Sequence, residues 1–310
     1  KSGSGPLTLS GNNTYTGTTT VTDSTLRISS DNNLGSGQVI LNGGNLLIEG
    51  GSPVTLDSSR GITTNASGSK IYVNGNAPTT FAGVIDGTGD IVKDNPGTLI
   101  LTGANTYAGP TNIRNGTLSI DGDASLGAIP GSATAEHLRI NGGDLQTTAS
   151  FTIDANRGVS LSDRGGDIKP NASTTLTIAG IIADDGSDTG SLVMSGDGIL
   201  KLTGNNTYSG TTTISSGTDD ITVANVISGS GSLRKNGSGT TTLTANNTYS
   251  GGTIIGGGTL QIGNGGTSGS LGTGAVTNNA NLAFNRSDSV TIAHTISGTG
   301  SLIQSGSGTL

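Results

Sequence analysis

Hydrophobic and polar residues alternate along this chain in many short runs. Thr98 to Thr102 reads Thr-Leu-Ile-Leu-Thr, and Leu7 to Leu9 and Thr242 to Thr244 alternate in the same way. A period of two is typical of a strand with one buried face. Glycine or an Asn-Gly pair interrupts these runs about every eight to ten residues, which leaves no room for the helix of a β-α-β crossover. The pattern therefore predicts many short strands and no membrane-spanning helix, since apolar runs such as Leu46 to Ile48 are far too short.

One seven-residue motif recurs four times, and it holds four of the five tyrosines of the chain. Its copies are Gly11–Gly17 (GNNTYTG), Gly103–Gly109 (GANTYAG), Gly204–Gly210 (GNNTYSG) and Ala245–Gly251 (ANNTYSG). The flanks keep a fixed register, with Gly ten residues before each tyrosine, Leu six before it and Thr ten after it. These leucines are Leu9, Leu101, Leu202 and Leu243. The third copy departs after Thr218, because Asp219 stands where the others have Leu.

Two further blocks accompany the motif. Upstream lies the pattern Ile-x-Gly-x-Gly, at Ile85–Gly89, Ile227–Gly231 and Ile296–Gly300. Downstream of three copies lies a Leu-Gly block, at Asn33–Gly35, Ser125–Gly127 and Ser270–Gly272. Because fixed offsets of this kind indicate repeats, we place copies near 3–28, 94–120, 195–221 and 236–262. The chain begins and ends inside the same block, so we expect a slice of a longer array whose fifth copy starts at 305.

The spacing of the copies predicts the architecture. Tyr208 and Tyr249 are 41 residues apart, which corresponds to two coils of about 20 residues each, the scale of a β-solenoid. We therefore predict an all-β fold over 1–310, a parallel β-helix of roughly 15 coils and about 70 Å in length, in which each coil bonds to its two neighbours. The segment 151–190 repeats least, and we expect irregular coils there.

The repeated residues have structural explanations in such a solenoid. Asparagines at one turn position could stack into amide ladders along the axis, as they do in fibrils. The candidates are Asn12, Asn205 and Asn246, or their neighbours Asn13, Asn105, Asn206 and Asn247. We expect the motif tyrosine to cover a corner with its ring while its hydroxyl reaches water. Glycine supplies the positive φ that tight corners require.

Composition supports this interpretation and excludes other classes. Gly, Thr, Ser and Asn make up 168 of 310 residues, and these residue types disfavour helix interiors. Charged residues are 11% of the chain and its net charge is −7, without the clustered Lys and Arg that nucleic acid requires. We therefore expect no nucleic-acid partner and no membrane insertion by this segment. The absence of cysteine excludes disulfides and cysteine-based zinc sites.

The pattern G-x-G-T-L-x-L-T-G-x-N-T-Y-x-G-x-T-x-I-x-x-G-T-L resembles the autotransporter-associated β-strand repeat, also called the passenger-associated transport repeat. The likeness fixes residue types over about 25 positions in each copy and, with the flanking blocks, covers about half to two thirds of the chain. The resemblance implies a right-handed β-helix exposed outside a bacterial cell, whose repeats assist export by folding as the chain emerges (type V secretion). The resemblance by itself does not imply a catalytic activity.

The most charged and least repetitive stretch, 154–188, is the candidate for chemistry. It holds Asp154, Arg157, Asp163, Arg164, Asp167, Lys169, Asp184, Asp185 and Asp188. Polysaccharide-cleaving enzymes use paired carboxylates or a base with bound Ca²⁺, so a site in 154–188 is the alternative to solvated turn charges. Such a site requires these groups to gather in one groove.

Other signals for cofactors and catalysis are weak. Asp184, Asp185 and Asp188 could ligate Ca²⁺, but they lack the later bidentate glutamate of a calcium loop. His137 and His294 stand alone in sequence, and we interpret both as surface or turn histidines. We therefore assign no catalytic, cofactor-binding or metal residue and expect no cofactor.

The leading hypothesis is a non-enzymatic segment of a bacterial surface exoprotein. It would serve as an export-assisting rod and as a surface for adhesion or self-association into fibres, with a host or neighbouring-cell ligand as the possible partner. The rival hypothesis is a polysaccharide-active β-helix enzyme with its site in 154–188.

Overall fold

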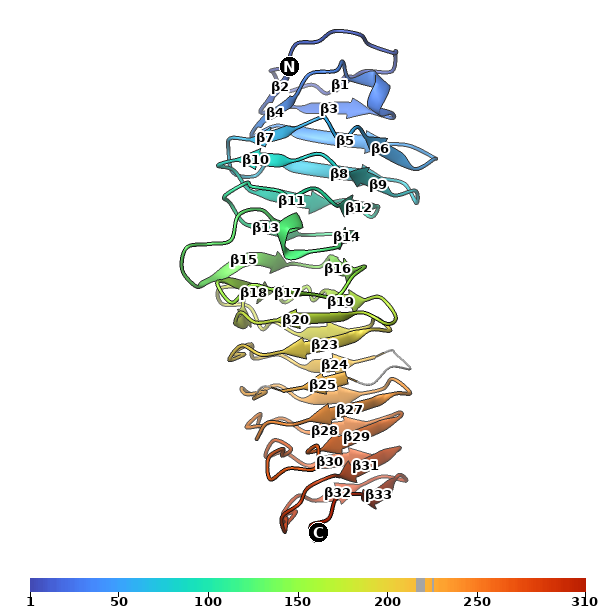
Figure 1. Cartoon of the computed structure of the whole chain (residues 1–310), viewed down its shortest axis with the longest axis vertical. Helices are drawn as coiled ribbons and strands as arrows, with labels where there is room; N and C mark the ends of the chain where they lie inside the picture. Colours follow the sequence, from blue (N-terminus) through green and yellow to red (C-terminus); the bar gives the residue numbers. More distant parts are fainter. Residues whose placement is uncertain (216–220, 225) are drawn as a thin grey trace.

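Short strands stack on one another along the whole length of the molecule. The computed structural model describes residues 1–215, 221–224 and 226–310, and these form 33 strands and two 3-10 helices, η1 (Asp31–Asn33) and η2 (Asp123–Leu126). All the strand pairs of the ladders are parallel. The chain winds from one end of an elongated body to the other, with its termini at opposite ends (Figure 1). The predicted all-β parallel solenoid is confirmed.

The strands form three faces that run along the axis. The first face is a nine-stranded sheet. It contains β1 (Leu7–Thr8), β3 (Thr25–Ile28), β5 (Asn45–Glu49), β8 (Lys70–Asn74), β11 (Ile91–Asp94), β13 (Thr111–Ile113), β15 (Thr134–Ile140), β18 (Arg157–Leu161) and β21 (Ile182–Asp184).

The second face is a twelve-stranded sheet that continues almost to the C-terminus. It contains β6 (Val54–Leu56), β9 (Thr79–Phe81), β12 (Thr98–Leu101), β14 (Thr117–Ile120), β16 (Asp144–Thr147), β19 (Asp167–Pro170), β22 (Leu192–Met194), β24 (Thr212–Ile214), β26 (Leu233–Lys235), β28 (Thr253–Ile255), β30 (Val276–Asn278) and β32 (Ile296–Ser297).

The third face consists of three shorter sheets in succession. The first has β2 (Thr19–Thr22), β4 (Val39–Asn42), β7 (Ile62–Thr64) and β10 (Ile85–Gly87); the second has β17 (Phe151–Ile153), β20 (Thr175–Ile178) and β23 (Ile199–Leu202); the third has β25 (Ile221–Val223), β27 (Thr240–Leu243), β29 (Thr259–Ile262), β31 (Asn281–Phe284) and β33 (Ser301–Gln304). The second motif copy and η2 lie between β10 and β17, while β23 contacts β25 directly, so the face is continuous.

The core is a set of columns of aliphatic side chains inside the coils. Leu26, Leu46 and Ile71 lie in register on successive strands of the first face, and all three are fully buried. Burying one such side chain stabilises the fold by about 1.5–3 kcal/mol. Because each column touches only the coils on either side, the stability of this fold is a sum over neighbouring coils.

Coil length varies, and this corrects the expected number of coils. The structure has about 13 turns rather than roughly 15. Register partners are 20 residues apart between Leu26 and Leu46 but 27 apart between Ile113 and Ile140, where a loop is inserted before β15. Longer corners use more residues per turn, so the same chain makes fewer turns. The segment 151–190 carries strands β17 to β21, each paired with a neighbouring coil.

No helix among the described residues is long and apolar enough to cross a membrane. The end of the third motif copy, including Thr218 and Asp219, lies outside the described residues.

Candidate functional site at the tyrosine corners

The seven-residue motif replaces a strand at a corner of the coil, and its tyrosine points inward. Tyr107, Tyr208 and Tyr249 are at most 2% exposed, whereas Tyr15, in the first coil, is 39% exposed. Each hydroxyl bonds to the threonine four residues later: Tyr107 to Thr111 at 2.5 Å, Tyr208 to Thr212 at 2.6 Å and Tyr249 to Thr253 at 2.7 Å. The expectation that the hydroxyl reaches water is therefore wrong for the buried copies. A buried phenol needs a partner, and the local threonine supplies one.

Burial also shifts the titration of these tyrosines. It raises the pKa of Tyr107 and of Tyr208 to about 12 because the phenolate loses its hydration, and it raises the pKa of Tyr249 for the same reason. Neutral tyrosine is therefore the form present at every physiological pH.

The motif asparagine bonds the corner to the coils before and after it. Asn105 Oδ1 accepts from the amide of Ile85 at 2.8 Å, and its Nδ2 donates to the carbonyl of Ser125 at 2.7 Å. Asn247 repeats the arrangement with Ile227 and Ser270. The predicted amide ladder is wrong at these positions, because the copies are too far apart along the axis to touch and the backbone of the adjacent coils offers both partners.

The second and fourth motifs each stack between the two flanking blocks. The Ile-x-Gly-x-Gly block forms the coil before the motif, where Gly109 donates to Gly89. The Leu-Gly block forms the coil after it, and its glycine packs against the tyrosine ring. A Cβ on Gly127 would come within 2.8 Å of a Tyr107 ring carbon, and Gly127 has φ of +80°. We call this three-coil unit the tyrosine corner.

The third corner shows what the Leu-Gly block contributes. Asn206 Oδ1 accepts from Ile182 at 3.1 Å, but its buried Nδ2 has no hydrogen-bond partner among the residues that the structure describes. The following coil carries Ile227–Gly231 in place of a Leu-Gly block. Sequence and structure therefore depart from the repeat at the same place.

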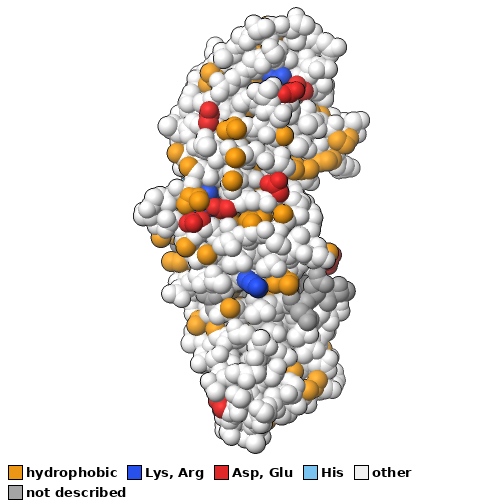
Figure 2. Space-filling view, viewed as in Figure 1, with side chains coloured by type: hydrophobic (Ala, Val, Ile, Leu, Met, Phe, Trp, Pro, Cys, Tyr) orange, Lys and Arg blue, Asp and Glu red, His pale blue; other side chains and the backbone are white. Residues whose placement is uncertain are grey.

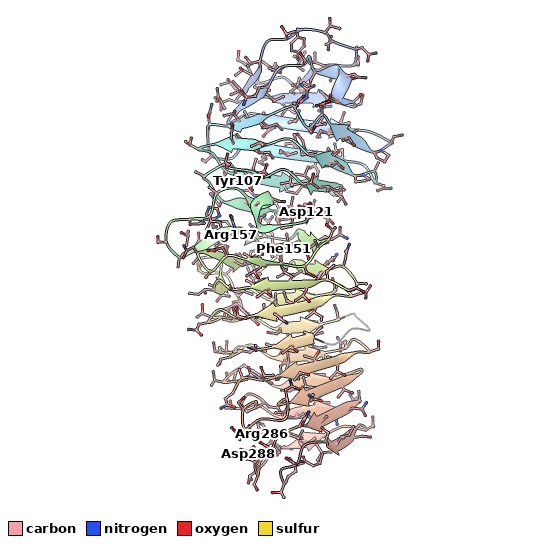
Figure 3. All side chains as sticks on the ribbon, in the orientation of Figure 1. Tyr107, Asp121, Phe151, Arg157, Arg286 and Asp288 are labelled. Atoms are coloured by element: carbon pink, nitrogen blue, oxygen red, sulfur yellow. The ribbon has the colours of Figure 1, made fainter. Side chains whose placement is uncertain are left out.

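In two of the corners, a buried arginine two coils after the tyrosine bonds to the coil between them. Arg157 is fully buried; its Nε donates to Asp123 at 2.9 Å, and its two terminal nitrogens donate to the carbonyls of Leu126 (2.8 Å) and Gly127 (2.9 Å). Figure 3 shows Arg157 close below Tyr107 along the axis. We call this arrangement the arginine clamp.

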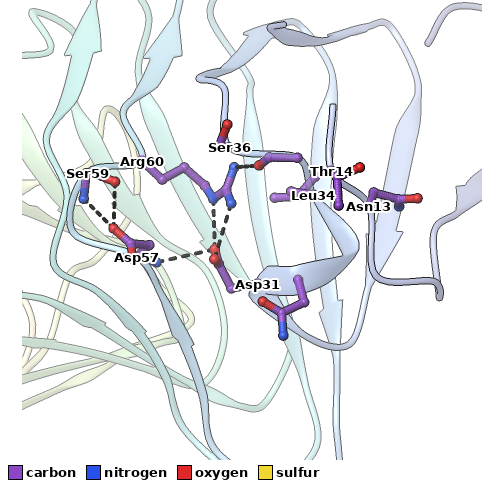
Figure 4. Close-up of a pocket in the computed structure, with 10 residues that line it drawn as sticks. Asn13, Thr14, Asp31, Leu34, Ser36, Asp57, Ser59 and Arg60 are labelled. Atoms are coloured by element: carbon purple, nitrogen blue, oxygen red, sulfur yellow. Dashed lines mark hydrogen bonds and ion pairs between the residues drawn. The ribbon is translucent and has the colours of Figure 1, made fainter. Parts of the chain in front are cut away.

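The first corner has a matching clamp. Arg60 bonds Asp31 at 2.7 Å through Nε and the carbonyl of Gly35 at 2.6 Å through Nη1 (Figure 4). A polar hollow of about 370 Å³ opens beside it and includes Asn13 and Ser59 in its lining.

The tyrosine motif in the sequence does not predict either clamp. A signal was present, since Asp57-Ser-Ser-Arg60-Gly and Asp154-Ala-Asn-Arg157-Gly share the pattern Asp-x-x-Arg-Gly. In both, the aspartate accepts from the amide two residues on and so forms the turn that starts the clamp strand.

Inward lysines bond the backbone at another corner. Lys93 is fully buried in a column between Ile71 and Ile113, and its Nζ donates to the carbonyls of Asp94, Asn95 and Asn115 at 2.6 to 3.0 Å. Burial lowers its pKa to about 8. Lys235 occupies the equivalent place in the fourth copy and donates to Gly237 and Gly257.

The charged stretch 154–188 is distributed over several corners. Arg157 belongs to the clamp, and Asp154 forms the turn before it. Asp167 and Lys169 lie on β19 of the second face, where Lys169 bonds Asp144 at 2.6 Å. Asp163 and the exposed Arg164 follow β18, and the amide of Asp163 reaches a carboxylate oxygen of Asp188 at 3.4 Å.

The three aspartates considered for calcium have other partners. Asp184 accepts from Gly190 (2.7 Å) and from the hydroxyl of Ser209 (2.7 Å). Asp185 faces Arg139 at 3.8 Å, and partial burial raises the pKa of its carboxyl. Among the described residues, no group of three or more His, Asp or Glu side chains converges as a metal site would.

The histidines differ from each other. His294 is half-buried, and its Nε2 lies 2.5 Å from the carbonyl of Gly272 in the fourth corner. His137 is only 6% exposed and contacts Arg157, so its interpretation as a surface or turn residue is wrong.

Sequence comparison identifies the repeat. The passenger-associated-transport-repeat family matches residues 1–28, 91–120, 192–218 and 233–262, which are the four copies recognised from the motif. The chain carries four passenger-associated transport repeats. Each tyrosine corner is thus the centre of one transport repeat together with its platforms from the coils on either side.

Two curated relatives share parts of the chain. The adhesin BmaC autotransporter of Brucella suis biovar 1 (strain 1330) is 42% identical over 141 residues, which are 45% of this chain and 4% of that protein. The probable autotransporter YfaL of Escherichia coli (strain K12) is 32% identical over 152 residues, which are 45% of this chain and 12% of that protein. The transport-repeat chain therefore spans a small part of each relative. No solved structure matches it.

Proposed function

We propose that this chain is a segment of an autotransporter-like passenger and that it acts as a non-enzymatic, surface-displayed rod. The observation that carries the proposal is the tyrosine corner, in which the asparagine of the second and of the fourth motif bonds to the coil before it and to the coil after it. Similarity to two proteins named as autotransporters, one of them an adhesin, supports it.

Stepwise folding gives such a rod a part in its own export. A coil that emerges at a membrane can bury its Leu and Ile on the coil folded before it, and this gain opposes backsliding of the chain. The corner adds bonds that form only when the next coil arrives, such as Asn105 to Ser125. Each transport repeat therefore retains its predecessor in the folded state.

The export role is tested in the full-length secreted protein. Replacing Asn105 with Ala removes both cross-coil bonds, and we expect less surface-exposed passenger at equal synthesis, measured by protease accessibility on intact cells. N12A is the control, since Asn12 is exposed and the cross-coil bond of the first copy is made by its neighbour Asn13. Equal display of the two variants would contradict the role.

The rod is also proposed as an adhesive or self-associating surface outside the cell. Most of the face seen in Figure 2 is neither charged nor apolar, and the chain's 11% charge leaves little repulsion between neighbouring rods. Sedimentation of the purified chain over a range of concentrations tests self-association, and binding to host or neighbouring cells tests adhesion. A monomer that binds no cell would remove both roles while leaving export intact.

The enzymatic alternative requires a groove in 154–188. A hollow of about 540 Å³ on the second face includes Lys169, Asn171 and Asp197 in its lining, but Arg157 and Asp184 are engaged elsewhere. Cleavage of polysaccharides that is abolished by D167N or K169M would establish this alternative instead.

A further inference from the structure

Both arginine clamps contain an aspartate, but only one of them also has a histidine as an acceptor. In the clamp of the second corner, Arg157 Nη1 lies 2.8 Å from His137 Nδ1. Arginine can only donate, so Nδ1 must accept and the ring proton must be on Nε2, which faces the backbone of Ala108. In the clamp of the first corner, the corresponding nitrogen of Arg60 donates to the carbonyl of Gly37 at 2.9 Å.

The His137 ring has no free position for a second proton. Arg157 faces it from β18, and Asp123 of η2 is already bonded to the Nε of Arg157. On its own strand, Glu136 pairs with Arg139 instead. A proton on Nδ1 would remove one of the acceptors of Arg157 and place two cations in contact in a buried site.

We propose that the clamp formed by Arg157, Asp123 and His137 is an acid-sensitive lock in the middle of the rod, whereas the Arg60 clamp is insensitive to pH in the same range. Protonation of His137 separates it from Arg157 and opens the coil that contains η2, the following loop and β15. The rest of the rod stays folded, because coils interact only with their neighbours.

The electrostatics fix the direction of the effect. Burial first and Arg157 second lower the pKa of His137 below its ordinary 6.5. The unfolded chain therefore binds more protons than the folded one as the pH falls below about 6.5. The stabilisation is complete above that pH and is lost as the pH falls through the folded-state pKa. In total, the equilibrium constant for opening rises about tenfold for each unit by which folding lowers the pKa of His137.

Hydrogen exchange at pH 7.5 and at pH 5, corrected for the intrinsic rate, tests the lock on the whole chain. We expect protection of β15 and η2 to fall at pH 5, while the strands around Arg60 keep theirs. H137N keeps an acceptor near the place of Nδ1 but cannot titrate, so its β15 protection should not change between the two pH values. H294N removes the other histidine and should behave like the unmodified chain.

An equal loss in H137N and the unmodified chain, or an equal loss around Arg60, would overturn the proposal. Ring NMR of the unmodified chain provides a second measurement that needs no variant at position 137. The chain has two histidines, and H294N assigns their signals. His137 titrating at or above 6.5 would overturn the lock even if H137N does not fold.

Discussion

Tyr107 shows how one residue type can mark a repeat without being catalytic. Its ring is fully buried against Gly127, and its hydroxyl is satisfied by a threonine only four residues away. The local bond lets a large aromatic residue turn inward at a corner where the backbone itself is not in a strand. This explains why tyrosine and threonine recur together at this spacing.

Removing the hydroxyl should therefore destabilise the corner. Y107F leaves Thr111 Oγ1 buried without its partner, and we expect a loss of about 1–2 kcal/mol in the free energy of unfolding, measured in urea. Y15F is the matched control, since Tyr15 makes the same 2.6 Å bond to Thr19 at an exposed site. Its expected loss is at most a few tenths of a kcal/mol. Equal losses in Y107F and Y15F would show that burial of the hydroxyl does not increase its contribution to stability.

The lowered pKa of Lys93 predicts that the free energy of unfolding rises with pH in the alkaline range. Its pKa is lowered to about 8 in the fold, against 10.5 in the unfolded chain, so the unfolded state binds more protons between these values. The free energy of unfolding should increase from pH 8 to about 9.5, below the range in which the tyrosines titrate. K93Q should lack this increase, because glutamine can donate to backbone carbonyls without titrating, as Gln304 does to the carbonyls of Gly306 and Gly308. A flat profile for both chains would contradict the assignment.

At the scale of elements, the second corner is built from three successive coils, and a glycine allows two of them to stack closely. Gly127 follows η2 in the left-handed region, directly over the Tyr107 ring. The Leu-Gly block is thus as much a part of the second tyrosine corner as the motif itself, although it lies 20 residues further along the chain.

Gly127→Ala should damage the corner, whereas the same replacement at Gly131 should not. The added Cβ would lie 2.5 Å from the Tyr107 carbonyl oxygen, and the positive φ adds strain. We expect a loss of about 2–5 kcal/mol, measured by thermal unfolding. G131A lies in the adjoining loop, where a Cβ meets nothing within 4 Å, and should be close to neutral. Similar effects of the two would show that the ring does not need a glycine platform.

For the whole molecule, the four repeats do not form a single stack. Hydrogen bonds place the first motif in line with η1, which contacts β6 of the second face, and the second motif between β10 and η2 on the third face. The third and fourth motifs follow β21 on the first face. The first corner, the second corner and the pair formed by the third and fourth therefore lie on three different faces of the rod.

Damage to one coil should remain local. L101D places a charge in the column between Phe81 and Ile120, where it costs more than about 4 kcal/mol. We expect protease cleavage around residue 101 while the C-terminal coils remain protected. Y72D changes a half-buried outward residue whose ring faces Lys70 at 5.5 Å, and it should leave the chain intact. Cleavage throughout the L101D chain would mean that the rod unfolds as one unit.

The sequence by itself determined the all-β solenoid, the four transport repeats and the inward leucines, because these depend on local alternation and on fixed offsets along the chain. It did not determine the bonds of the asparagines, the burial of the tyrosine hydroxyls or the position of His137. Those depend on which residues lie one coil above or below, and corners of variable length set that alignment. Arg60 and Arg157 illustrate the division, because their shared pattern is visible in the sequence while their partners Asp31 and Asp123 are 29 and 34 residues away. Only stacking of the coils brings these charges together, and only stacking places a histidine in one clamp and a carbonyl in the other.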